Sequence, residues 1–280
     1  MSQATDARAR TAAGWLRLIR PRARALDVAV GHLAVPVALV LVWWALAATV
    51  GPSLVASPPA AVRALVRGAA SGWLTTHGAA TLLALVYGYA LALLVGAVVG
   101  FAIASSRFAY DVLQPLIYAL YTLPKVTLFP IFLFIFGIST ASQAWFAMFF
   151  GVFPILIFTT AGVREVRPVL LKVAKVLRFG PIRRFQRVVL PAALPAIVTG
   201  LRMGFGLTFL GVVMSEMFAS QAGLGFLLVQ SVRLRDMPRL YGLVLLLTIF
   251  AFAVNGLFLM WERRVRHERA QGQESVTGVQ

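Results

Sequence analysis

The stretch Ala79–Ser105, AATLLALVYGYALALLVGAVVGFAIAS, decides the fold class because it contains no Lys, Arg, Asp or Glu. A helix that crosses the hydrocarbon core of a membrane needs about 20 mostly apolar residues. This run exceeds that length, and the charge-free region around it extends from Arg67 to Arg107. The stretch therefore predicts a transmembrane helix.

The composition extends this conclusion to the whole chain. Hydrophobic residues make up 60% of the 280 residues, charged residues make up 12%, and the mean hydropathy is +0.86. Soluble globular proteins average about 25% charged residues, so this chain has too few to cover a water-exposed surface. A water-soluble enzyme, a disordered chain and a coiled coil are excluded, and an all-α polytopic membrane protein is expected.

Apolar runs of spanning length recur along the chain and predict six transmembrane helices. The third run is interrupted by Lys125 and by Pro115, Pro124 and Pro130. Within the spans, Pro124, Pro130, Pro154 and Pro195 are expected to kink their helices. The expected spans are Val28–Val50, Ala79–Ser105, Val112–Phe136, Ala141–Val163, Val188–Ser215 and Leu240–Trp261. The organisation expected from them is a basic segment (1–27), a first span with an external surface helix (28–78), a core of five spans (79–264) with a cytoplasmic loop (164–187), and a tail (265–280).

The basic residues predict the orientation of these spans. Membrane proteins concentrate Lys and Arg in their cytoplasmic loops. Here most of them lie in the N-terminal segment, in the loop 164–187 and in the tail, so both termini are expected in the cytoplasm. Ala45-Leu46-Ala47 resembles a signal-peptide cleavage site, but the apolar run before it exceeds the usual length, which favours a retained anchor.

The residue inventory argues against catalytic and metal chemistry in this chain. It has no cysteine, and its three histidines (His32, His77 and His267) are too far apart in sequence for a helical metal pair. No G-x-x-x-x-G-K-[ST] phosphate loop occurs, so no ATP site is expected. In a soluble protein, the net charge of +17 would suggest nucleic-acid binding. Here the expected cytoplasmic placement of the basic residues explains the charge.

The loop 164–187 contains a candidate amphipathic helix, Pro168–Phe179. Proline suits the first turn of a helix, and Gly180-Pro181 is expected to end it. Valine and leucine recur at helical spacing, and Lys172, Lys175 and Arg178 fill the other side. Such a basic helix either lies on anionic lipid or docks a soluble partner, and periodicity alone slightly favours lipid.

Three strings after this loop resemble the permease subunits of bacterial ABC importers, most closely the nitrate, sulfonate and taurine branch. They are LPAALPAIVTGLR at 190–202, SEM at 215–217 and GLG at 223–225. Leu123-Pro124-Lys125 through Phe136-Gly137 also looks like the third span of that branch. The resemblance runs from about Tyr89 to Arg264 and implies a type I ABC importer permease-like fold in the bacterial plasma (inner) membrane.

The resemblance also implies how the loop helix acts. In the family, this loop carries an E-A-A…G signature that fits a groove in the ATPase. The E-A-A positions fall here on Lys172, Val173 and Ala174, the glycine falls near Arg178, and only Ala174 keeps the pattern. Lysine in place of glutamate implies either an acidic groove on the ATPase or less conventional coupling. The residues expected at the ATPase contact are Leu171, Lys172, Val173, Ala174, Lys175, Leu177, Arg178 and Gly180.

The implied partners complete an importer. Two copies of an ATP-binding subunit would hold ATP and Mg, and a periplasmic or extracellular solute-binding protein would deliver the solute. The permease itself would form a homodimer in the lipid membrane, carry no cofactor and bind no nucleic acid.

Charged groups within the spans are candidates for the translocation path. Lys125 and Arg202 lie about 20 Å into the third and fifth spans at 1.5 Å per residue. Two cations at similar depth would suit an anion, although each could instead bind a helix carbonyl or another helix. Glu216, about 21 Å beyond Arg202, is expected to cap or brace the outer end.

Two other function classes make different demands. A stand-alone channel or secondary transporter would require intramembrane carboxylates for ion coupling, and Glu216 is the one candidate. An intramembrane enzyme would require paired histidines, paired carboxylates or a Ser/His set at membrane depth, and no such set is visible in the sequence.

Overall fold

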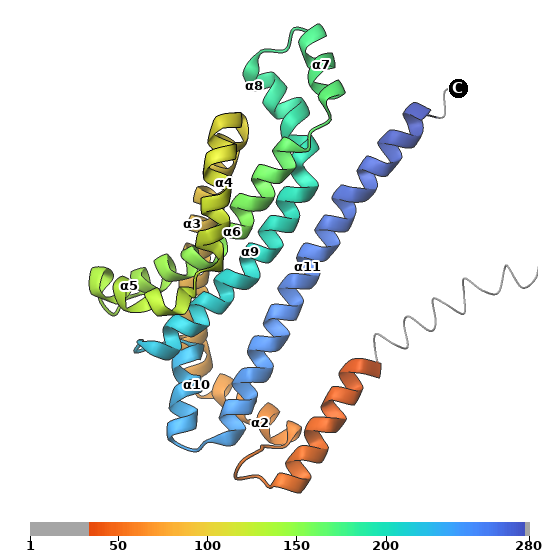
Figure 1. Cartoon of the computed structure of the whole chain (residues 1–280). Coiled ribbons are helices and arrows are strands. Elements are labelled where there is room, and N and C mark those ends of the chain that lie inside the picture. Colours follow the sequence, from red (N-terminus) through yellow and green to blue (C-terminus); the bar gives the residue numbers. More distant parts are fainter. Residues whose placement is uncertain (1–33, 278–280) are drawn as a thin grey trace, which may run out of the picture.

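The computed structural model describes residues 34–277, with side chains described as far as residue 265. Within this range the regular elements are helices (Figure 1). In chain order they are Ala34–Val50, α2 (Pro58–Ala70), α3 (Trp73–Ser105), α4 (Arg107–Thr122), η1 (Lys125–Leu128), α5 (Phe129–Phe136), α6 (Thr140–Arg164), α7 (Pro168–Val176), α8 (Pro181–Arg184), η2 (Phe185–Val189), α9 (Leu190–Phe218), α10 (Leu224–Arg233) and α11 (Met237–Thr277).

The centre of the molecule is the packing of α3 and α9 against α6, which is the most buried long helix described. Small residues allow the backbones to approach, as is usual between membrane helices. On α3 they recur every fourth residue at Gly88, Ala92, Gly96 and Gly100. A Cβ added at Gly96 would lie 2.9 Å from the Cβ of Ile155 on α6.

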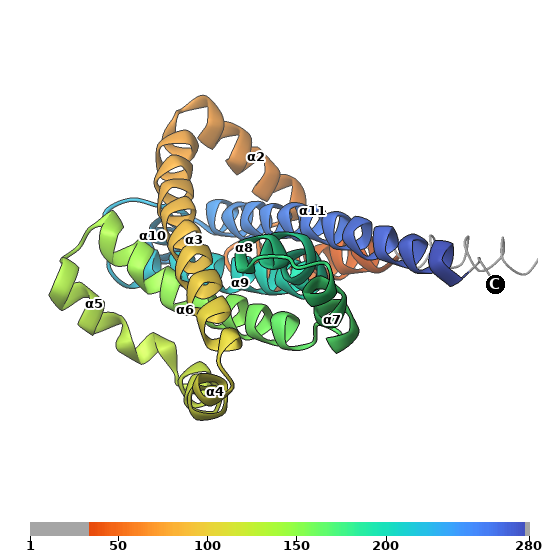
Figure 2. The same ribbon diagram turned by 90° about the horizontal axis from the view of Figure 1, so that it is seen from above.

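The long helix α11 runs along the outside of this centre (Figures 1 and 2). Of the 18 most apolar consecutive residues in α11, 6% are buried, whereas 67% are buried in the corresponding part of α6. Large apolar side chains such as Phe252 and Leu257 are therefore exposed, which suits a lipid-facing helix.

Four of the six predicted spans coincide with helices long and apolar enough to cross a membrane. These helices are Trp73–Ser105, Thr140–Arg164, Pro181–Phe218 and Met237–Val265. The described part of the first predicted span is the 17-residue apolar helix Ala34–Val50, and residues 28–33 lie outside the described range.

The third predicted span, which Lys125 and prolines interrupt in the sequence, is a broken helix. The axis bends by 86° between α4 and the η1–α5 segment. Pro124 lacks a backbone N–H and disfavours helical geometry at Leu123, which is extended (φ −58°, ψ 141°). Pro154 and Pro195, by contrast, lie inside the continuous helices α6 and α9.

The loop helix is shorter than expected. Its predicted end was Phe179, but α7 ends at Val176, and Arg178 adopts a left-handed backbone (φ 51°). The N–H of Arg178 donates to the carbonyl of Lys175, and the N–H of Phe179 donates to that of Ala174. These two bonds form a Schellman motif, which ends the helix before Gly180 is reached.

Candidate functional site

The helix α7 projects with α8 from one end of the helix bundle (Figure 1). Pro168 occupies its first turn, where the missing N–H costs no intrahelical bond. The Schellman motif then ends α7, and Arg178 takes the left-handed position at which glycine is preferred. The resemblance places the family's glycine near Arg178. The backbone there has the positive φ that glycine adopts without strain.

Several large apolar residues of α7 are exposed. Val173 is 50% exposed and Val176 is 81% exposed, whereas Ala174 is only 1% exposed. An isolated helix of nine residues is marginal, so its stability depends on contacts. In the described chain those contacts bury Ala174 and leave much of the Val173 and Val176 side chains exposed.

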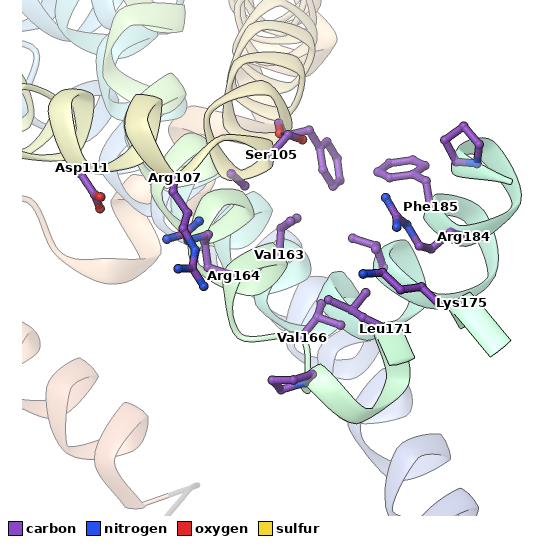
Figure 3. A pocket seen from close by; sticks show the side chains of 15 residues that line it. Ser105, Arg107, Asp111, Val163, Arg164, Val166, Leu171, Lys175, Arg184 and Phe185 are labelled. Atoms are coloured by element: carbon purple, nitrogen blue, oxygen red, sulfur yellow. The ribbon is translucent and has the colours of Figure 1, made fainter. Parts of the chain in front are cut away.

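The residues expected at the ATPase contact divide into three groups. Leu171 and Lys175 line a cavity on the bundle side of α7 (Figure 3). Ala174 is buried, and the rest are exposed: Lys172, Val173, Leu177, Arg178 and Gly180. The outward surface of α7 therefore combines apolar side chains with the cation of Lys172.

Lys125 lies at the break between α4 and α5 and is buried. Its Nζ donates to the carbonyl of Tyr121 at 2.6 Å, a carbonyl that the broken helix leaves without its usual donor. The ammonium also lies 4.6 Å from the ring centroid of Tyr121 and 5.3 Å from that of Phe153. The lysine thus satisfies the broken backbone and is surrounded by aromatic rings.

Arg202 pairs with another helix, which is one of the alternatives that the sequence left open for it, although the partner Glu262 was not named. Its Nε lies 3.1 Å from Oε2 of Glu262 on α11, and the hydroxyl of Thr199 donates to Oε1 of the same carboxylate. The Glu262 side chain is 8% exposed and that of Arg202 is 27% exposed. The charge of Arg202 is therefore compensated within the protein.

Glu216 holds the start of α10 and is 1% exposed. Its Oε2 accepts from the N–H of Gly225 at 2.8 Å and from the hydroxyl of Thr81 at 3.0 Å. The Thr81 hydroxyl accepts from Leu224 N–H, and Nδ1 of His77 accepts from Gly223 N–H. The carboxylate and the two side chains of α3 therefore cap the N-terminus of α10.

The three candidate path residues are thus not brought together. Lys125, Arg202 and Glu216 each contact different partners, and the sequence reasoning missed Glu262, Thr81 and His77. Glu262 directly follows the sixth predicted span, which is the signal that could have indicated it. Among the described residues, no group of three His, Cys, Asp or Glu side chains could hold a metal ion.

This chain is similar to a known protein family and to several transport proteins. A family model described as "Binding-protein-dependent transport system inner membrane component" matches residues 92–267. The chain is 35% identical over 147 residues to the nitrate import permease NrtB of Synechocystis sp., covering 52% of this chain and 54% of that protein. It is 28% identical over 178 residues to the putative aliphatic sulfonates permease SsuC of Bacillus subtilis, covering 64% and 63%.

A longer match is to the taurine transport permease TauC of Escherichia coli, 30% identical over 215 residues and covering 74% of this chain and 77% of that one. Two inward-facing crystal forms of the MetNI methionine ABC transporter share the fold at 17% identity. Their TM-scores are 0.55 and 0.57, and the matches cover 67% and 75% of this chain and 91% and 99% of theirs.

Proposed function

We propose a function for this chain from its family, because it belongs to the binding-protein-dependent transport system inner membrane components, which are transport subunits and not enzymes. It forms the translocation path for a small oxyanion. It couples through α7 to a separate ATPase. Two ATP-binding subunits bind ATP and Mg, and a solute-binding protein delivers the solute to two copies of this permease. Both termini and α7 lie in the cytoplasm of a bacterium.

The observation that carries this proposal is the outward apolar surface of α7. Val173 and Val176 are exposed on a short helix that projects from the bundle. Burying them against another protein removes apolar area from water at about 25 cal/mol per Å². Lys172 on the same surface favours a groove with acidic side chains on the ATPase, since opposite charges steer and orient association.

The names of the relatives support an oxyanion as the solute. Those proteins are described as permeases for nitrate, aliphatic sulfonates and taurine. Lys125 is the favoured path cation in this chain because it forms no ion pair among the described side chains, whereas Arg202 is neutralised by Glu262. Its aromatic surroundings exclude water, which strengthens attraction for an anion.

Co-purification tests the docking of the ATPase. The full-length tagged chain is extracted from its native membrane in mild detergent, and mass spectrometry quantifies the ATPase recovered with it. We expect about equal amounts of the two proteins with the wild type, and about a tenfold loss with Val176→Asp, because a buried unpaired carboxylate costs more than 1.4 kcal/mol.

The matched control is Ile182→Asp, which places the same charge at a side chain of similar exposure on α8, outside the docking residues. It should retain the ATPase. Equal retention by both variants would contradict docking through α7, as would a wild-type chain that is recovered alone even after chemical crosslinking.

Uptake of labelled nitrate, taurine and ethanesulfonate tests Lys125. Lys125→Met should abolish uptake of the transported anion while the ATPase still co-purifies, and Lys125→Arg should retain part of it because the positive charge remains. Unchanged uptake by Lys125→Met would remove this residue from the translocation path.

A further inference from the structure

A cavity of about 860 Å³ lies between the ends of α3, α4 and α6 and the loop formed by α7, α8 and η2. Figure 3 shows Arg107 and Arg164 on one side of it, and Lys175 and Arg184 on the other. Arg107 begins α4, whereas Arg164 ends α6, and Lys175 and Arg184 lie in the loop that follows α6. The fold therefore gathers four basic side chains around one space.

The charge of the lining is strongly positive. Asp111 is the one acidic residue among the fifteen lining residues. Among the side chains that the structure describes, none of the four basic residues makes an ion pair. Arg164 is held in place by the ring of Tyr110, whose centroid lies 4.4 Å from its guanidinium carbon.

Backbone dipoles add to this positive field. The 16-residue helix α4 begins at Arg107, and α7 begins at Pro168, so the N-termini of both helices lie at the cavity. Free N–H groups and the helix dipole make such termini favourable for anions. Four unpaired cations and two helix N-termini together match a phosphate group, whose oxygens accept several charge-assisted hydrogen bonds.

The remaining wall of the cavity is apolar and indicates where the phosphate comes from. Phe101, Val163 and Phe185 line it, and the rings of Phe101 and Phe185 pack edge to face at 5.0 Å between centroids. The cavity lies where the spanning helices α3 and α6 end, which is the level of lipid headgroups. A free phosphate would contact only the basic side chains. A lipid would contact the basic side chains with its phosphate and the apolar wall with its acyl chains.

We propose that this cavity binds the phosphate headgroup of an anionic lipid of the cytoplasmic leaflet, with its acyl chains along the adjoining spans. The assignment of the leaflet rests on the orientation given under the proposed function. Basic pockets between transmembrane helices on the cytoplasmic side hold such headgroups in general. The bound lipid ties the loop that carries α7 to the ends of α3 and α6, and so fixes the position from which α7 projects.

Native mass spectrometry of the purified full-length chain tests this proposal in a neutral detergent. The probes are phosphatidylglycerol, zwitterionic phosphatidylcholine and inorganic phosphate, each added separately. We expect phosphatidylglycerol to bind most tightly. The variant Arg164→Gln/Arg184→Gln should weaken its binding about thirtyfold, since each cation near an anionic headgroup contributes about a factor of five.

The matched control, Arg183→Gln/Arg187→Gln, removes two charges from the same loop at positions that do not line the cavity. It should bind phosphatidylglycerol as the wild type does. If the first variant does not fold, Arg107→Gln/Lys175→Gln provides the same test from the other residues. Equal weakening in variant and control would overturn the proposal, and so would inorganic phosphate binding as tightly as the lipid.

Lipid binding is measured on the isolated permease, and ATPase docking is measured by co-purification. A negative result in one measurement therefore leaves the other proposal standing. A chain that binds phosphatidylglycerol in the cavity without recovering an ATPase would contradict the proposed function alone.

Discussion

Glu216 is a charged residue at the end of a span, but its contacts in the structure are those of a helix cap. Its carboxylate accepts the N–H of Gly225 and the hydroxyl of Thr81, and it lies directly against Gly223. The sequence indicated a bracing role from its place at the end of a span. The partners could not be predicted, because Thr81 is 135 residues away and comes near only after α3 and α9 have packed.

Gly223→Ala should disrupt this cap. Gly223 has a positive φ of 117°, and an added Cβ would overlap the Glu216 carboxyl group. We expect a loss of about 2 kcal/mol or more in stability, measured as a lower unfolding temperature in detergent. Gly206→Ala on α9 is the control, because its Cβ would meet nothing within 4 Å. Equal stability of both variants would show that the close contact at Gly223 is unimportant.

Arg202 and Glu262 give a second test at this scale. Arg202→Met should lower stability by about 2 kcal/mol, because the buried Glu262 carboxylate loses its ion pair with Arg202. The double variant Arg202→Met/Glu262→Gln should recover most of this loss, since the carboxylate that Arg202 compensated is then removed as well. Thermal unfolding and solute uptake are measured together. If Arg202→Met retains full stability but loses uptake, Arg202 acts on the solute and not on α11.

Among the elements, the spans were the easiest part to predict and their internal geometry the hardest. Length and hydropathy were sufficient for α3, α6, α9 and α11, because a span must be long and apolar wherever it packs. A kink was expected at Pro124, which lies at the 86° bend between α4 and the η1–α5 segment, but the size of the bend could not be predicted. Prolines are tolerated inside α6 and α9, so a proline alone does not indicate whether a helix breaks or continues.

The α3–α6 contact is testable through one glycine. A Cβ at Gly96 would lie 2.9 Å from Ile155 and 3.0 Å from the carbonyl oxygen of Val152, so Gly96→Ala must separate the helices. We expect about 1–3 kcal/mol of destabilisation, seen in thermal unfolding. Gly78→Ala, on the same helix in open space, is the matched control and should be neutral. An unaffected Gly96→Ala protein would contradict the described packing.

At the scale of the whole molecule, the distribution of basic residues predicts which end faces the cytoplasm. The chain has no cysteine, so each introduced cysteine is a unique reporter. In intact cells a membrane-impermeant maleimide should label Ser71→Cys, at the end of α2, and leave Ile182→Cys on α8 unlabelled until the cells are permeabilised, because Ile182 is exposed and lies outside the docking residues. Labelling of Ile182→Cys alone in intact cells would reverse the orientation.

The central claim is that this chain transports by coupling to ATP and does not transport alone. The most direct measurement is accumulation of labelled nitrate, taurine and ethanesulfonate in the native cells, comparing depletion of ATP with collapse of the proton gradient at constant ATP. Our account predicts that accumulation stops on ATP depletion, persists without the proton gradient, and is absent with Val176→Asp. Accumulation that survives ATP depletion and follows the proton gradient would contradict it and indicate a secondary transporter.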